Sequence, residues 1–250
     1  MTPRNPSLPF RSSGPGRHAR LAGALVVLSA LGGCATGPGA NPADPLEPFN
    51  RKVSRFNDVV DDNVLVPVAT AYQRVLPSPV RTGVSNFFGN LGDVWNFANS
   101  VVQLKPQASL ESLMRFNVNT FLGLGGLLDI ATEVGIDRHS EDFGQTLGRW
   151  GVPSGPYVVL PLLGPSTVRD TAALPVDAYG DLIRHVGDVP VRNSLYVLRI
   201  VDLRSSYLRA GQLLGDAALD KYSFTRDAYL QRRRSDVYDG NPPDDGAGKD

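Results

Sequence analysis

Residues able to act as nucleophiles, bases or metal ligands are scarce in this chain of 250 residues. It has one cysteine, Cys34, and three histidines. The segment His139-Ser140-Glu141-Asp142 contains the residue types of a hydrolase triad. Adjacent residues do not form a triad, however, because nucleophile, base and orienting carboxylate must converge from different elements. We therefore predict that this segment is a surface turn.

Other segments that resemble catalytic or nucleotide-binding motifs are incomplete. The segment around Ser85, Gly83-Val84-Ser85-Asn86-Phe87, lacks the closing glycine of a nucleophile elbow. Residues 123–128 lack the third glycine and the preceding strand of a dinucleotide fingerprint. No P-loop occurs, and no residues have the spacing of metal ligands. The sequence predicts a protein that is not an enzyme, with no catalytic residue, no metal site and no cofactor.

Cys34 ends a segment that has the features of a bacterial secretory signal. Four arginines precede an apolar stretch at 21–30, and Leu31-Gly32-Gly33-Cys34 follows it. The stretch is about half as long as a membrane-spanning helix requires. A small-residue cleavage site directly before a cysteine resembles the lipobox of bacterial lipoproteins, so we predict that Cys34 carries a lipid anchor. The alternative is a free or buried cysteine behind an ordinary signal.

The net charge of the mature chain bears on the kind of partner it can bind. The 25 basic residues of the whole chain include four arginines in 1–33, which has no acidic residue, so the mature chain has 25 − 4 = 21 basic against 25 acidic residues. A net charge of −4 gives no reason to expect nucleic acid as a partner.

We predict a signal peptide at 1–33, a lipidated cysteine and tether at 34–43, one helical domain at 44–236 and a disordered tail at 237–250.

Apolar residues at helical spacing predict a first amphipathic helix near the start of the domain. Asp44, Pro45 and Glu47 have the pattern of a helix cap and first turn, although Pro48 indicates a separate initial turn. The apolar face contains Phe49, Val53, Phe56, Val60 and Val64, and the polar face contains Asn50, Arg51, Arg55, Asn57, Asp58, Asp61 and Asp62.

Further helices are predicted downstream. Residues 78–102 are predicted to form two helices, because Gly89-Asn90-Leu91-Gly92-Asp93 interrupts the apolar pattern. Ser109 is expected to cap the next helix, a long helix is expected at 195–214, and a last one from about 223 towards 234. Strand-like alternation is almost absent, so the predicted fold is mainly α-helical.

The segment 121–131 breaks the amphipathic pattern, since Asp129 is its only charged residue. As a helix it would be roughly 15 Å long, half the hydrocarbon core of a bilayer. It is predicted to enter one leaflet, and a buried helix end in a soluble core is the alternative. Its glycines are interpreted either as a hinge that gates lipid or as sites of close backbone approach: Gly123, Gly125 and Gly126.

Two more groups of residues are candidates for membrane contact. The basic run Arg232-Arg233-Arg234 either meets anionic head groups or, as we favour, complements the C-terminal end of a helix. The predicted membrane or lipid contacts are the large apolar residues of the first helix and of 121–131: Phe49, Phe56, Phe121, Leu122, Leu124, Leu127 and Leu128.

Four blocks of sequence together resemble the VacJ/MlaA family of outer-membrane phospholipid-transport lipoproteins. They occur in order over about 44–236, and the third is long and specific. Pro48 is a departure, because the family commonly has glycine there. The blocks are DPLEPFNR at 44–51, NVNTFLGLGGLLDIA at 117–131, DFGQTLGRWGVPSGPYVVLPLLGPSTVRD at 142–170 and YSFTRDAYLQR at 222–232.

The resemblance implies a ring-like bundle of amphipathic helices embedded in one membrane leaflet, with a lipid channel through it. It implies removal of mislocalised phospholipids from the outer leaflet, which maintains lipid asymmetry. The implied partners are phospholipid, a trimeric porin and a soluble periplasmic lipid carrier, with an inner-membrane ABC transporter downstream. The implied location is the periplasmic face of the outer membrane of a Gram-negative envelope, and Ala35 after the anchor agrees with that address.

Two alternative functions remain open at this stage. The first is a structural lipoprotein that tethers the membrane to another envelope component. The second is a phospholipid hydrolase that uses Ser140 or Ser85 with His139.

Replacing Cys34 with serine is expected to leave an unprocessed or mislocalised protein that no longer fractionates with the outer membrane. Each buried CH₂ of an acyl chain contributes about 0.8 kcal/mol, and the two or three chains expected on this cysteine exceed what stable attachment requires. Density fractionation of membranes measures the effect, with Thr36→Ser as the control. Normal outer-membrane fractionation of the Cys34→Ser variant would contradict the anchor.

Overall fold

The computed structural model describes residues 44–217 and 219–243. The predicted signal peptide, Cys34 and the tether lie outside the described residues. Helices dominate the described part, and the labels begin at α2. The helical elements are α2 (Glu47–Val60), a π-helix η1 (Asp61–Leu65), α3 (Val66–Val75), α4 (Ser78–Val102), α5 (Pro106–Phe121), α6 (Ile130–Glu133), α7 (Phe143–Arg149), α8 (Val168–Gly180), a 3₁₀-helix η2 (Leu182–His185), α9 (Val189–Ser206), α10 (Leu208–Ala217) and α11 (Lys221–Val237).

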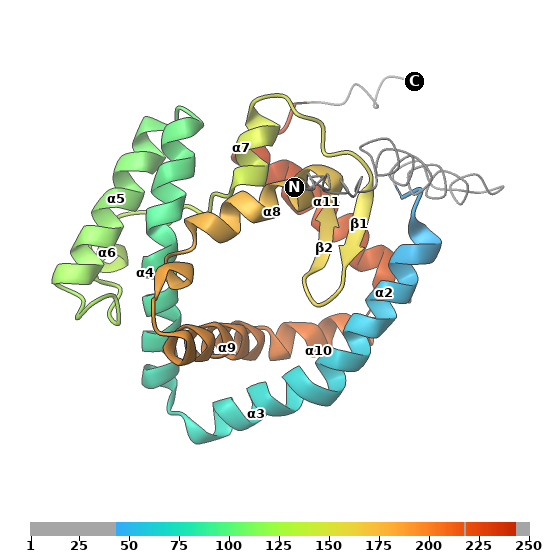
Figure 1. Ribbon diagram of the computed structural model, residues 1–250, viewed down its shortest axis with the longest axis horizontal. Helices are drawn as coiled ribbons and strands as arrows, with labels where there is room; N and C mark the ends of the chain where they lie inside the picture. The colour runs from blue at the N-terminus through green and yellow to red at the C-terminus, as the bar shows by residue number, and fades with distance from the viewer. Residues whose placement is uncertain (1–43, 218, 244–250) are drawn as a thin grey trace, which may run out of the picture.

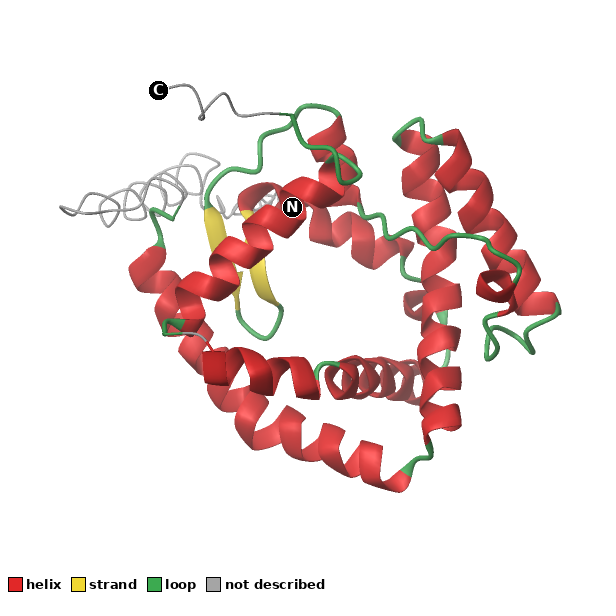
Figure 2. Cartoon of the chain, turned by 180° about the vertical axis from the view of Figure 1, so that it is seen from behind, coloured by secondary structure: helices red, strands yellow, loops and turns green. Residues whose placement is uncertain are grey.

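The helices are arranged as a ring (Figure 1). The long helix α4 forms one side, α2 the opposite side, α3, α9 and α10 lie along the bottom, and α7 and α8 along the top. The pair α5 and α6 packs on the outer side of α4. Seen from behind, the same ring is evident, with one small β-hairpin beside it (Figure 2). The prediction of a ring of helices is confirmed.

The hairpin is an element that the sequence analysis did not predict. Strands β1 (Tyr157–Leu160) and β2 (Gly164–Thr167) pair antiparallel, with Tyr157 opposite Thr167 and Leu160 opposite Gly164. Two asparagines of α2 satisfy the free backbone edge of the first strand. Asn50 donates to the Tyr157 carbonyl at 3.0 Å, and Asn57 donates to the Leu160 carbonyl at 2.9 Å. The polar face of α2 therefore binds protein backbone instead of facing only water.

The two ends of the domain meet at Asp44. This carboxylate is fully buried and accepts hydrogen bonds from Asn50 Nδ2 at 2.9 Å, from the Tyr222 hydroxyl and from Arg226 Nη1 at 3.4 Å. Asp44 is thus not the cap of α2, which begins at Glu47 after a turn with Pro48 in its first helical turn. The predicted separate turn is confirmed. Asp44 joins the start of the domain to α11, and so closes the ring.

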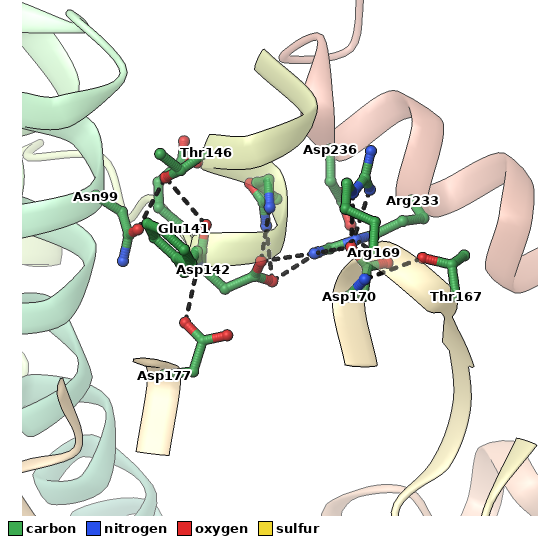
Figure 3. Close-up of polar contacts among 12 residues, drawn as sticks. Asn99, Glu141, Asp142, Thr146, Thr167, Arg169, Asp170, Asp177, Arg233 and Asp236 are labelled. Carbon is green, nitrogen blue, oxygen red and sulfur yellow. Dashed lines mark hydrogen bonds and ion pairs between the residues drawn. The ribbon is translucent and has the colours of Figure 1, made fainter. Parts of the chain in front are cut away.

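A second cluster joins α7, α8 and α11 around Arg233 (Figure 3). The Arg233 guanidinium donates to both oxygens of Asp142 at 2.6 Å and to Asp170 at 2.9 and 3.0 Å. Burial alone would raise the pKa of Asp170, but the hydrogen bonds and charge of Arg233 hold that pKa below its usual range. Arg233 is thus held by two carboxylates, whereas Arg234 lies in the last turn of α11, as the favoured interpretation of the basic run expects. Contact of the run with head groups stays a prediction.

The segment 139–142 belongs to the same polar region and is not a surface turn. Asp142 caps α7, and Glu141 is buried, accepting from Gln103 and Lys105 at 2.8 Å. The prediction failed because these partners come from the distant end of α4, and local sequence carries no sign of them.

A carboxylate on α9 connects the bottom of the ring to its side. Asp202 accepts from the Tyr72 hydroxyl of α3 at 2.9 Å and from Ser85 Oγ of α4 at 2.6 Å. Burial, together with the hydrogen bond to Asp202, raises the pKa of Tyr72 to about 12. Ser85 is therefore held in a structural contact.

Several predicted helix boundaries differ from the structure. Residues 78–102 form one helix. Gly89 within it lets the Arg138 guanidinium approach, since an added Cβ would lie 2.5 Å from its Nη1. Ser109 lies inside α5 and donates to the Lys105 carbonyl instead of capping the helix. The long helix predicted at 195–214 is interrupted at Tyr207, between α9 and α10. Packing decides these boundaries against local propensity.

The described chain also continues past residue 236, where the predicted tail begins. Val237 is the last residue of α11 and is buried, and Asp239 forms an ion pair with Lys105 at 2.6 Å. The boundary predicted at 236 therefore falls within the packed part of the molecule. Residues 244–250 lie outside the described residues.

Replacing Arg233 with methionine is expected to lower the free energy of unfolding by roughly 3 kcal/mol, because the buried carboxylate of Asp170 and the partly exposed one of Asp142 lose their shared cation. Chemical denaturation monitored by circular dichroism measures the loss. The matched control is Arg232→Met at the neighbouring, mostly exposed position, with an expected change of about 0.5 kcal/mol or less. Equal losses in both variants would contradict the central role of Arg233.

Candidate functional site

The distribution of polarity is inverted relative to that of a typical soluble protein. Tyr157 and Ile183 are the only apolar members of the largest fully buried side chains in the described part of the chain. The other members are Arg115, Asn50, Asn119, Thr146, Thr167, Asp44, Asp93, Ser100 and Ser112. Large apolar side chains are instead exposed on almost every element of the ring. Such extensive exposed apolar surface marks contact with a membrane or with protein.

All seven predicted contact residues are exposed. Phe121 is 79 % exposed and Leu124 71 %, and they lie with Leu122, Leu127 and Leu128 at the end of α5. Phe49 and Phe56 lie on α2, on the other side of the ring (Figure 1). The structure thus brings five of them together and separates two. Lipid contact by these residues stays a prediction.

The sequence analysis missed other exposed apolar residues. Leu104 is 87 % exposed at the turn between α4 and α5, and Leu162 and Leu163 form the tip of the β-hairpin. The segment Pro161-Leu162-Leu163-Gly164 was a usable signal, because a proline and a glycine around two leucines indicate an apolar turn.

The apolar segment after α5 is a loop and not a short helix. Residues 122–128 form successive turns between α5 and α6, so the predicted helix through 121–131 is wrong. The backbone bonds of the loop are nevertheless satisfied internally. Gly125 N–H donates to the Thr120 carbonyl at 3.0 Å, Gly126 to Asn119 at 2.8 Å, and Leu128 to Gly123 at 2.9 Å. We name residues 121–128 the apolar loop.

Local backbone geometry explains why glycine occupies each of these three positions in the apolar loop. Gly125 and Gly126 have φ values of +74° and +93°, which side chains rarely adopt. A Cβ on Gly123 would lie 2.2 Å from the Leu128 carbonyl oxygen. These facts agree with the close-approach interpretation of the glycines. The hinge remains a prediction, and alanine at Gly125 cannot test it cleanly because the positive φ makes the substitution strained.

A buried ion pair fixes the base of the apolar loop. Arg115 of α5 is completely buried and donates to both oxygens of Asp129 at 2.7 and 2.8 Å. Asn119 also donates to Asp129 at 3.0 Å and accepts from the Ala131 N–H at 2.8 Å. Burial alone would raise the pKa of Asp129, but the hydrogen bonds from Thr132, Asn119 and Arg115 lower it to about 2. The loop is therefore held firmly at both ends.

A large amphipathic cavity lies where η1, α9, α10, α11 and the hairpin meet. Its volume is about 1070 Å³. Charged side chains line it together with aromatic and aliphatic side chains. The lining residues are Asp61, Asp62, Val66, Pro165, Arg204, Tyr207, Leu208, Ala210, Gly211, Gln212, Lys221, Phe224, Thr225, Ala228, Tyr229 and Arg232. Such a cavity suits a ligand with both a charged and an apolar part.

Comparison with known proteins shows the family to which this chain belongs. The family model described as MlaA lipoprotein matches residues 42–236. The intermembrane phospholipid transport system lipoprotein MlaA of Shigella flexneri is 35% identical over 219 residues, which cover 85% of this chain and 86% of that protein. The chain belongs to the MlaA lipoprotein family. Its Haemophilus influenzae relative, with the same description, is 35% identical over 87% of this chain and 90% of its own length.

A solved structure of similar architecture extends the family match to three dimensions. The description of that structure is "Structural basis for maintenance of bacterial outer membrane lipid asymmetry". Its TM-score is 0.68 at 34% sequence identity, and the match covers 79% of this chain and 99% of that one. Within the described residues, no helix has both the length and the apolar character needed to cross a membrane.

The four blocks that resemble the MlaA family have structural roles in this chain. The first contains Asp44 and Asn50, the second forms the apolar loop, the third contains Asp142, the hairpin and Asp170, and the fourth begins with Tyr222. The blocks therefore coincide with the contacts that close the ring and shape its apolar surface.

Two residues of the hydrolase alternative, Ser85 and His139, have separate partners. His139 contacts Glu111, whereas Ser85 contacts Asp202. The pKa of Glu111 is lowered by its hydrogen bond with His139. In the described part of the chain, no cluster of His, Cys, Asp and Glu has the form of a metal site.

The Asp129 carboxylate is expected to make stability sensitive to acid. Its pKa is lowered from 3.8 to about 2, so its contribution is fully present above about pH 4 and is lost as the pH falls towards 2. Asp129→Asn should be less stable at pH 7, and should lose about 2 kcal/mol less than wild type between pH 5 and 2. Denaturant titrations at each pH measure this, with the exposed Asp137→Asn as control. Parallel curves for wild type and Asp129→Asn would refute it.

Proposed function

We propose that this protein removes mislocalised phospholipids from the outer leaflet of the outer membrane and passes them to a periplasmic lipid carrier. The observation that carries the proposal is an amphipathic cavity between elements of a helical ring that exposes many large apolar side chains. The relatives named as lipoproteins of an intermembrane phospholipid transport system support it.

The physical problem in moving a phospholipid is its charged head group. An unpaired ion in hydrocarbon costs at least several kcal/mol, so the path must be polar on one side. The acyl chains need apolar surface at the same time. Arg204 and Lys221 in the cavity wall provide the charged surface, and Leu208 and Phe224 provide the apolar surface.

The exposed apolar perimeter defines how the ring meets the membrane in this proposal. The apolar loop and α2 insert into the inner leaflet from opposite sides of the ring, and a lipid on Cys34 adds attachment. A trimeric porin holds the ring in the outer membrane. An inner-membrane ABC transporter that empties the carrier supplies the direction of flow, because the sequence lacks a P-loop.

The proposed function requires no covalent chemistry, so the protein acts as a transporter and not as an enzyme. Ser85 and His139 support this by their separate contacts with Asp202 and Glu111. Release of fatty acid or head group from phospholipid by the purified protein would show the hydrolase alternative instead.

Narrowing the cavity is expected to slow lipid removal without unfolding the ring. Ala228 lines the cavity from α11, and Ala228→Trp should reduce transport by about tenfold, a barrier increase of about 1.4 kcal/mol. The measurement is the amount of outer-leaflet phospholipid in cells, labelled with a membrane-impermeant head-group reagent. Gln231→Trp, at an exposed position of the same helix outside the lining, is the control. Normal asymmetry in the Ala228→Trp strain would argue against transport through this cavity.

A further inference from the structure

The charged part of the cavity contains an arginine in a form suited to a phosphodiester. Arg204 donates through Nε to one oxygen of Asp61 at 2.6 Å and through Nη2 to the other at 2.8 Å. Asp61 occupies this fork, so the Nη1 group of Arg204, for which the described residues supply no acceptor, is left to donate to a phosphate oxygen. The two side chains are 21 % and 27 % exposed, so a ligand in the cavity can reach them.

The π-helix places a second carboxylate beside this pair. Both Asp61 and Asp62 of η1 line the cavity, and segments of π-helix occur frequently at functional sites. Asp62 accepts no hydrogen bond from any residue that the structure describes. The hydrogen bond that Arg204 donates to Asp61 is the main cause of the raised pKa of Arg204, and the charge of Asp62 adds to it. The Asp62 carboxylate is therefore available to a cationic group.

The remaining cations at the cavity already face carboxylates. Lys221 pairs with Asp58 at 2.7 Å, and Arg232 lies 3.7 Å from Asp236. Arg204 pairs with Asp61, so each of the three cations at the cavity has one carboxylate partner. Asp62 is a further carboxylate at the cavity that has no cation of its own. An anionic head group would bring a phosphate to this site but no cationic group that could pair with the carboxylates of Asp61 and Asp62. A zwitterionic head group brings a phosphate and an ammonium together.

We propose that the cavity selects zwitterionic phospholipids over anionic ones, with the lipid phosphate on Arg204 and the lipid ammonium on Asp62. The inference rests on the proposed function and adds its substrate class. The neighbouring apolar residues Tyr207, Leu208 and Phe224 of the same cavity contact the part of the lipid next to the head group.

The experiment purifies the full-length protein from mixed micelles that hold equal amounts of phosphatidylethanolamine and phosphatidylglycerol. Mass spectrometry then measures the ratio of the two lipids retained by the protein. We expect about threefold enrichment of phosphatidylethanolamine, the size of one partly exposed ion pair. Asp62→Asn should abolish the enrichment while it keeps the total lipid, and Asp62→Glu should preserve it. Asp137→Asn removes an exposed carboxylate elsewhere and should leave the ratio unchanged.

The outcomes separate this inference from the transport proposal. Retention of both lipids in the ratio of the micelles, by wild type, would overturn the selectivity and leave transport intact. Enrichment that survives in Asp62→Asn, with native circular dichroism, would overturn the role of Asp62. Wild-type protein that retains no phospholipid at all would count against the proposed function itself. Arg204→Gln and Asp61→Asn test the phosphate position: loss of total lipid in the first and not in the second supports it.

Discussion

A ring of helices cannot rely on one central hydrophobic core, and this constraint explains most of the structure. The small apolar cluster of Tyr157, Val159 and Tyr222 serves the junction of the hairpin with α11 and with Val53 of α2. Elsewhere the helices are joined by buried polar groups, such as Asp44 with Tyr222 and Arg233 with its two carboxylates. If the outer surface faces lipid, apolar packing gives little preference for protein over acyl chains, whereas an unpaired charge is costly. Polar contacts then determine which helices meet.

The same constraint decides what the sequence could predict. Periodicity located α2, α5 and α11 well, because a helix with one apolar face shows it in its own residues. It did not reveal that the polar face of α2 binds the hairpin through Asn50 and Asn57, since partners a hundred residues away leave no local trace. The hairpin itself was missed because its strands have four residues each, too few for a convincing alternation.

The candidate site likewise has one part that the sequence predicted and another part that it did not. The large apolar residues from Phe121 to Leu128 were identified as candidates because an apolar run is visible in sequence, although their loop conformation was not foreseen. The cavity was not foreseen at all. Its lining combines Asp61, Arg204 and Phe224, which belong to three helical elements, and only the closed ring brings them together. The resemblance to a family supplied the function, whereas composition and spacing predicted no catalytic residue, metal site or cofactor.

The contact between Asp44 and Tyr222 joins residues 178 positions apart. Contacts of such long range form late and slowly in folding, because the loop entropy must be overcome before the contact contributes. A chain that is exported from its N-terminus presents α2 to α5 well before α11 is available. The apolar faces of the early helices are then uncovered during passage through an aqueous compartment. Closure of the ring is therefore the step that ends the interval in which the apolar faces of the early helices lack their partners.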